Sequence, residues 1–172
     1  MYKRQLLDSS YKFHQITHGL EEHGITLSKP KLELSKMMER KNSIVKKLTS
    51  GVSQLFAHNK VASIHGRGKL IDQNTVEVTD DKGKKKKVTA KNIILATGSR
   101  PINIPSVPWN GTTIIGSSGA LELTEVPKNL AIIGAGVIGL ELGSVWSRLG
   151  SKVEIFEAEK EFLPMPVSYT HL

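Results

Sequence analysis

Residues 130–157 read LAIIGAGVIGLELGSVWSRLGSKVEIFE, and the expected fold depends on this stretch. An apolar run typical of a buried parallel strand stops at Gly134. A helical repeat of apolar residues follows and ends at Gly150, where a left-handed cap is expected. A second strand is predicted over residues 152–156, directly before Glu157. This order of strand, turn, helix and strand predicts an α/β protein.

The turn in this stretch carries the pattern G-x-G-x-x-G. Gly134 allows a tight turn, Gly136 lets the backbone approach a pyrophosphate, and Gly139 lets the helix pack close to the strand. Free N–H groups and the positive end of the helix are suited to hold the phosphates. The turn therefore predicts a dinucleotide-binding site.

The acid at the end of the second strand indicates which dinucleotide binds. Glu157 lies 23 residues after Gly134, against roughly 20 in known sites. Its carboxylate can accept hydrogen bonds from an adenosine ribose and repels a 2′-phosphate, and Ala158 and Glu159 supply no arginine. This favours NAD over NADP. The alternatives are a glycine-rich turn in another α/β protein, or a membrane span, which the glycines and Glu141 disfavour.

Composition restricts the function further. The 172 residues include 24 lysines and arginines against 16 acids, a net charge of +8, and no cysteine. We therefore expect no disulfide or thiol chemistry within this chain. The first residues are polar and lack the apolar core of a signal peptide, so a soluble, cytoplasmic protein is expected.

Both ends of the chain look foreign to the rest. Residues 1–5 and 166–172 resemble translated sequencing adapters, and we exclude them from fold reasoning. We expect that the natural chain continues at both ends.

The other segments predict helices followed by short strands. Helices are expected over residues 6–22, 32–57 and 117–123, and strands over 60–65, 70–71, 75–78, 84–88, 93–95 and 112–115, with a break at 66–68 and a turn at 80–83. We interpret the lysine run at 84–87 as a solvated hairpin tip. His14, His18 and His23 have no carboxylate arranged with them, so we expect surface histidines and no metal site.

Several segments resemble the flavin disulfide reductases. AKNIILATGSRPINIP (residues 90–105) is similar to their second FAD-contacting segment, and residues 134–157 are similar to their NAD fingerprint. The segments LLDSSYKFHQ (6–15), EEHGI (21–25) and GLELGSVWSRLG (139–150) are most similar to the dihydrolipoyl dehydrogenases. The resemblance covers residues 6 to about 164.

This resemblance implies a Rossmann-like, three-layer α/β fold. Residues 6–110 would form a partial FAD-binding domain of helices plus a β-meander, and residues 111–165 the first βαβ unit of an NAD-binding domain. It also implies a reaction, in which dihydrolipoamide reduces a redox disulfide, which reduces FAD, which passes hydride to NAD⁺. The implied partners are lipoyl-bearing subunits of 2-oxoacid dehydrogenase or glycine cleavage complexes and a second copy in a homodimer, with no nucleic acid and no membrane span.

The resemblance also implies roles for single residues. Gly68 matches a glycine near the FAD adenine, and Glu141 matches a glutamate near the nicotinamide. The segment matching the second FAD contact is Thr97, Gly98 and Ser99. Glu157 matches the ribose acid, and the NAD pyrophosphate loop matches Gly134, Ala135, Gly136, Val137, Ile138, Gly139 and Leu140.

Several parts of the family pattern are missing. The chain has no redox cysteine pair, no first FAD glycine fingerprint and no catalytic His-Glu pair. We therefore expect an internal fragment without catalytic residues. Such a fragment would bind NAD weakly or not at all, lack diaphorase activity and have poor solubility because strand edges are uncovered.

Three other functions stay open at this stage. The parent protein could be another flavin disulfide reductase, such as a glutathione reductase, a mercuric reductase or a soluble transhydrogenase. It could be a basic nucleic-acid-binding module, an interpretation that rests on net charge and the lysine run alone. A non-catalytic nucleotide-sensing domain is a third possibility if the natural chain lacks cysteines.

Overall fold

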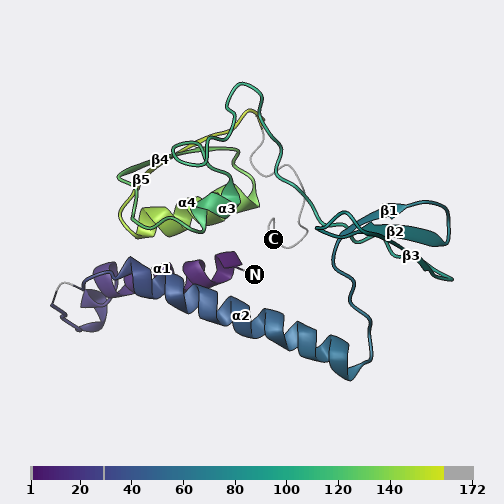
Figure 1. The fold of residues 1–172 in the computed structure, drawn as a ribbon. Helices are drawn as coiled ribbons and strands as arrows, with labels where there is room; N and C mark the ends of the chain where they lie inside the picture. Colours follow the sequence, from purple (N-terminus) through teal and green to yellow (C-terminus); the bar gives the residue numbers. More distant parts are fainter. Residues whose placement is uncertain (1, 29, 161–172) are drawn as a thin grey trace. The chain divides into compact units, whose positions relative to one another are not determined.

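A computed structural model describes residues 2–28 and 30–160 of the chain (Figure 1). The chain divides into two compact units. Met1–Lys47 with Pro101–Leu172 form the first, here called the helical unit, and Leu48–Arg100 form the second, the meander unit. None of the helices in the described ranges combines the length and apolarity that crossing a membrane requires. The adapter-like end at 166–172 lies outside the described residues.

The first helix is displaced relative to its prediction over residues 6–22. Helix α1 spans Tyr2–His18 and therefore includes residues 2–5, which the sequence reasoning had excluded. It ends early because Gly19 follows, and glycine has a low helix propensity. A separate 3₁₀ helix, η1, spans Glu21–His23 and closes on Gly24, whose φ of +72° is left-handed. The predicted single helix is thus wrong at both ends.

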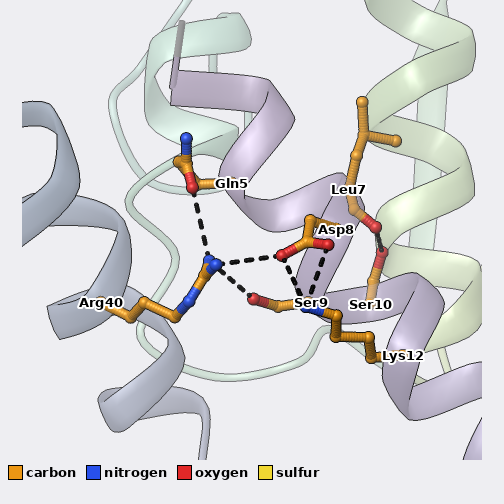
Figure 2. Close-up of polar contacts among 7 residues, drawn as sticks. All are labelled: Gln5, Leu7, Asp8, Ser9, Ser10, Lys12 and Arg40. Carbon is orange, nitrogen blue, oxygen red and sulfur yellow. Dashed lines mark hydrogen bonds and ion pairs between the residues drawn. The ribbon is translucent and has the colours of Figure 1, made fainter.

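Helix α2 spans Leu34–His58, close to its predicted range, and it is joined to α1 by one arginine. Figure 2 shows the Arg40 guanidinium among three side chains of α1. It lies 3.0 Å from Asp8 Oδ2, 3.3 Å from Ser9 Oγ and 3.4 Å from Gln5 Oε1. These groups are solvent-accessible, so the contacts add little to stability.

The predicted strand, turn, helix and strand are all present. Strand β4 spans Asn129–Ile133, α4 spans Val137–Arg148, and β5 spans Lys152–Phe156. β4 and β5 pair in parallel, with Ile132 opposite Ile155. The prediction that β4 is buried was wrong, because exposed and half-buried residues alternate along it. Helix α4 covers one face of this two-stranded sheet (Figure 1).

The core of the helical unit is centred on α4, and Leu130 of β4 and Val153 of β5 pack against it. Val145, Trp146 and Leu149 of α4 are buried against Leu6 of α1 and Leu34 of α2. Trp146 is fully buried. Helix α4 therefore contributes to a core that the sheet and the long helices share.

A buried lysine joins α2 to the segment after α3. The Lys41 side chain is fully buried, and its ammonium donates to the Leu121 carbonyl at 2.6 Å and to Glu122 Oε1 at 2.7 Å. A buried ammonium requires such acceptors, because an unpaired charge away from water is costly. This contact crosses 80 residues of sequence and was not predicted.

The connector before β4 differs from its prediction. Residues 112–115 form no strand, because the Asn110 side-chain oxygen accepts hydrogen bonds from the N–H groups of Thr112, Thr113 and Ile114 at 2.8–3.0 Å. Such an Asx turn competes with extended pairing. Helix α3 spans only Ser117–Ala120, short of its predicted end at residue 123, and its N-cap is Gly116.

The meander unit contains a three-stranded antiparallel sheet in the order β1-β2-β3. Its strands are β1 at Arg67–Leu70, β2 at Thr75–Thr79 and β3 at Lys85–Thr89. The predicted turn at 80–83 is confirmed, since Asp80 Oδ1 accepts hydrogen bonds from the N–H groups of Lys82 and Lys84.

Two predicted strands of this unit are absent. Residues 60–65 form no strand, and the expected break at 66–68 lies instead at the start of β1. Residues 93–95 are also irregular, and Ile94 and Leu95 are 90% and 72% exposed. An extended segment becomes a strand only when a neighbour satisfies its backbone groups, and no described residue pairs with these segments.

The buried tryptophan should dominate the stability of the helical unit. We expect Trp146→Ala to lower the free energy of unfolding by about 3–5 kcal/mol, because truncation leaves a large cavity. The matched control is Trp109→Ala, since Trp109 is 47% exposed, and its cost should be about 1 kcal/mol or less. Urea unfolding followed by circular dichroism measures both, and equal costs would contradict this core assignment.

Candidate dinucleotide-binding site

The turn after β4 depends on a left-handed glycine. Gly134 has a φ of +103°, and its N–H donates to the Phe156 carbonyl at the end of β5 at 2.8 Å. A Cβ at this position would meet no atom within 4 Å. The requirement for glycine here is therefore conformational, because side chains disfavour this φ.

Two further glycines allow α4 to approach the sheet. A Cβ at Gly139 would overlap the carbonyl oxygen of Gly134 and lie 3.2 Å from Ile132 Cγ2. A Cβ at Gly143 would lie 3.0 Å from Ile132 Cδ1. Sequence reasoning missed Gly143, although its place one helical turn after Gly139 was a usable signal.

The N-terminus of α4 is open and lacks a side-chain cap. Gly136 is the N-cap, with extended backbone angles, and as a glycine it has no side chain with which to cap the helix. A Cβ at Gly136 would meet nothing within 4 Å, and Val137 and Ile138 are exposed. Uncapped N–H groups at the positive end of a helix fit a pyrophosphate.

The Glu157 side chain turns toward this hinge. Its Oε2 accepts a hydrogen bond from Ala135 N at 2.6 Å, and its Oε1 accepts from Ala158 N at 2.7 Å and from Glu159 N at 3.0 Å. The N–H groups of Glu159, Ala135 and Ala158 hold the pKa of the Glu157 carboxyl below its ordinary value of 4.5. Glu157 is therefore ionised at neutral pH, and a carboxylate has further lone pairs for ribose hydroxyls.

Glu141 lies on α4 beyond the hinge and has a partner that was not predicted. Its Oε2 lies 2.5 Å from Lys3 Nζ of α1, and both side chains are about one-third exposed or less. Lys3 belongs to the segment that sequence reasoning excluded, and 138 residues separate the pair, so no local signal could reveal it. The nicotinamide role of Glu141 stays a prediction.

The residues matched to FAD lie in the other unit. Gly68 is in β1 opposite Val78. Thr97, Gly98 and Ser99 are exposed in an irregular segment, where Gly98 has a φ of +75°. The structure places these four residues within the meander unit, and their contact with FAD stays a prediction.

The histidines of the N-terminal segment do not gather around a possible metal site. Within the described ranges, no three histidine, aspartate or glutamate side chains are close enough to hold a metal ion. The rings of His14 and His18 stack with centroids 4.7 Å apart. His18 Nδ1 lies 2.6 Å from Thr17 Oγ1.

Comparison with known families agrees with this geometry. The model of the family described as pyridine nucleotide-disulphide oxidoreductase matches residues 6–170. The chain belongs to this family. Among solved structures, LpdA of Mycobacterium tuberculosis has a TM-score of 0.81 at 22% identity, covering 95% of this chain and 36% of that one. The flavoprotein disulfide reductase RclA of Escherichia coli has a TM-score of 0.72 at 25% identity, covering 95% and 33%.

Two of the curated relatives that this chain matches carry different names. Leghemoglobin reductase of Vigna unguiculata is 44% identical over 161 residues, which cover 94% of this chain and 31% of the relative. The mitochondrial dihydrolipoyl dehydrogenase of Pisum sativum is 41% identical over 161 residues, covering 94% and 32%. The chain spans about a third of the length of the curated relatives it matches. The predicted α/β fold and family are therefore confirmed.

The ionisation of Glu157 should be visible at the hinge. Folding lowers the pKa of the Glu157 carboxyl. The stability that the carboxylate contributes is therefore fully present above pH 4.5, and it is lost as the pH falls through the pKa of Glu157 in the folded state. We expect the Ala135 amide proton to shift with a midpoint below 4.5 in an NMR titration. The shift should vanish in Glu157→Gln, and its persistence there would show that another group is responsible.

The two hinge glycines should differ in how much stability the protein loses when each is replaced by alanine. Gly139→Ala should lower the free energy of unfolding by about 1–3 kcal/mol, because its Cβ overlaps the Gly134 carbonyl. Gly136→Ala has room for its Cβ and should cost less than about 1 kcal/mol, mainly through the weaker N-cap. Urea denaturation compares the two, and a larger cost at Gly136 would contradict the assigned roles.

Proposed function

We propose that residues 129–159 form the pyrophosphate-binding and ribose-binding half of an NAD site in a flavoprotein oxidoreductase. The observation that carries this proposal is the hydrogen bond between Glu157 Oε2 and Ala135 N, at 2.6 Å. It places an ionised carboxylate beside the glycine turn at the uncapped end of α4. That is the arrangement in which a ribose and the adjoining pyrophosphate can be bound together.

Each part of the hinge has a separate task in this proposal. The N–H groups at the start of α4 bind the pyrophosphate, and Gly136 leaves its approach unobstructed. Glu157 accepts hydrogen bonds from the ribose hydroxyls and repels a 2′-phosphate, so NAD is preferred over NADP. When bound, NAD supplies the hydride acceptor, and the protein orients it.

The parent activity that we propose is dihydrolipoyl dehydrogenation. It is supported by the family and by several relatives that carry this name, such as the enzyme of Pisum sativum. FAD as second cofactor, lipoyl-bearing subunits as partners, a homodimer and a cytoplasmic location are parts of this proposal. The proposal also includes an FAD-domain boundary near residue 110. It further includes the inactivity of the isolated chain, which has no cysteine to serve as a redox thiol.

Cofactor preference tests the role of Glu157. Residues 129–159 of this chain would replace the corresponding residues of the full-length Pisum sativum enzyme, and kcat/KM would be measured with NAD and NADP. We expect the graft to prefer NAD. In the graft, Glu157→Arg should shift the preference toward NADP by about 10- to 100-fold, because hydrogen bonds to a charged group are lost and a phosphate partner is gained.

The matched control is Glu154→Arg, which makes the same charge change three residues earlier, on β5. The Glu154 carboxylate is exposed and pairs with Lys152 Nζ at 3.1 Å, away from the Glu157 contacts. We expect this control variant to keep the NAD preference of the graft. Equal shifts in both variants would mean that general charge, and not the position of Glu157, sets the preference.

A further inference from the structure

The register of the meander sheet gathers positive charge on one of its faces. Residues directly opposite each other in antiparallel strands point to the same side. One row across the three strands joins Arg67, Thr79 and Lys85, and the next joins Lys69, Glu77 and Lys87. Four cations therefore surround one carboxylate on a side that we call the basic face, made of Arg67, Lys69, Glu77, Lys85 and Lys87.

The opposite side of the same sheet has a different character. Its rows join Leu70, Val76 and Val88, and Gly68, Val78 and Lys86. It is mainly apolar, and of the three lysines in β3 only Lys86 lies there. The alternation along β3 thus places Lys85 and Lys87 on the basic face and their neighbour on the other.

The single acid does not neutralise this face. Glu77 Oε1 lies 3.0 Å from Lys85 Nζ. Lys85, with Lys87 and Lys69 near it, holds the pKa of the Glu77 carboxyl below its ordinary value of 4.5. All three lysines therefore lie close enough to Glu77 to stabilise its carboxylate. Residues 48–100 contain ten basic and four acidic residues, so most of the net charge of +8 lies in this unit.

We propose that the basic face is a docking surface for an acidic polypeptide segment, rich in aspartate and glutamate, that lies across the three strands. The other residues on this side of the sheet are Thr75, Thr79 and Thr89, and the strands contain no aromatic ring. The face therefore offers no stacking platform for the bases of a single-stranded nucleic acid. Cationic groups and hydroxyls along the three strands match carboxylates in an extended peptide.

A role in preventing aggregation does not account for the whole face. Lysines on an edge strand discourage pairing with other sheets, and β3 is an edge strand. That role requires charge on the two edge strands, β1 and β3, but it does not require the charges to lie on one side of the sheet. Arg67 and Lys69 lie on β1, at the other edge, yet they point to the same side as Lys85 and Lys87. The face belongs to the meander unit and the hinge at Gly134 belongs to the helical unit, so failure of one proposal leaves the other intact.

Two double variants of the full chain test this proposal. Lys85→Gln with Lys87→Gln removes two charges from the basic face. Lys84→Gln with Lys86→Gln removes two charges from the same run, including the lysine on the other side of β3. Binding of a fluorescent poly-glutamate peptide at low salt is measured by anisotropy, and circular dichroism verifies folding.

We expect the first variant to weaken binding about five-fold and the second to leave it nearly unchanged. Lys85→Arg with Lys87→Arg should keep the affinity, because the charges remain in place. Equal losses in the two glutamine variants would overturn the proposal, since only bulk charge would then matter. No binding by the unmodified chain, or tighter binding of a poly-thymidine oligonucleotide of equal charge, would also overturn it.

Discussion

The close approach of α4 to the parallel sheet is the constraint on which the helical unit depends. Gly139 and Gly143 leave no room for a Cβ against Gly134 and Ile132. Because the helix lies so near β4, its first N–H groups emerge beside the carboxyl ends of both strands. The same helix carries Val145, Trp146 and Leu149, which form the core with Leu6 of α1 and Leu34 of α2. The position of α4 against the sheet therefore determines both the packing of the core and the geometry of the candidate site.

The long helices are positioned by polar contacts around this core. Arg40 joins α2 to α1, and Lys41, the next residue, joins α2 to the segment after α3. The two side chains differ in environment, since Lys41 is fully buried and Arg40 is solvent-accessible. We expect the buried contact to be the more specific of the two, because an ammonium without acceptors is costly away from water. Lys3 adds a third link, from α1 to Glu141 of α4.

Local patterns predicted the elements whose signals lie within a few residues. The hinge from β4 to α4, the turn at Asp80 and the length of α2 follow from glycine positions, turn residues and helical periodicity. The strands expected over residues 60–65, 93–95 and 112–115 were wrong for a different reason. An apolar or alternating run shows only that a segment can pair, whereas a strand exists only if a partner is present, or if no side chain such as Asn110 competes.

The sequence by itself determined the glycine hinge, the acid at position 157 and the family, because these depend on short spacings that the backbone geometry requires. Only the tertiary structure decided that Glu157 hydrogen-bonds Ala135, that Lys41 and Lys3 have acceptors far along the chain, and that four cations share one face of the meander. Contacts of this kind join residues distant in sequence. Their partners are set by packing and strand register, which no local pattern specifies.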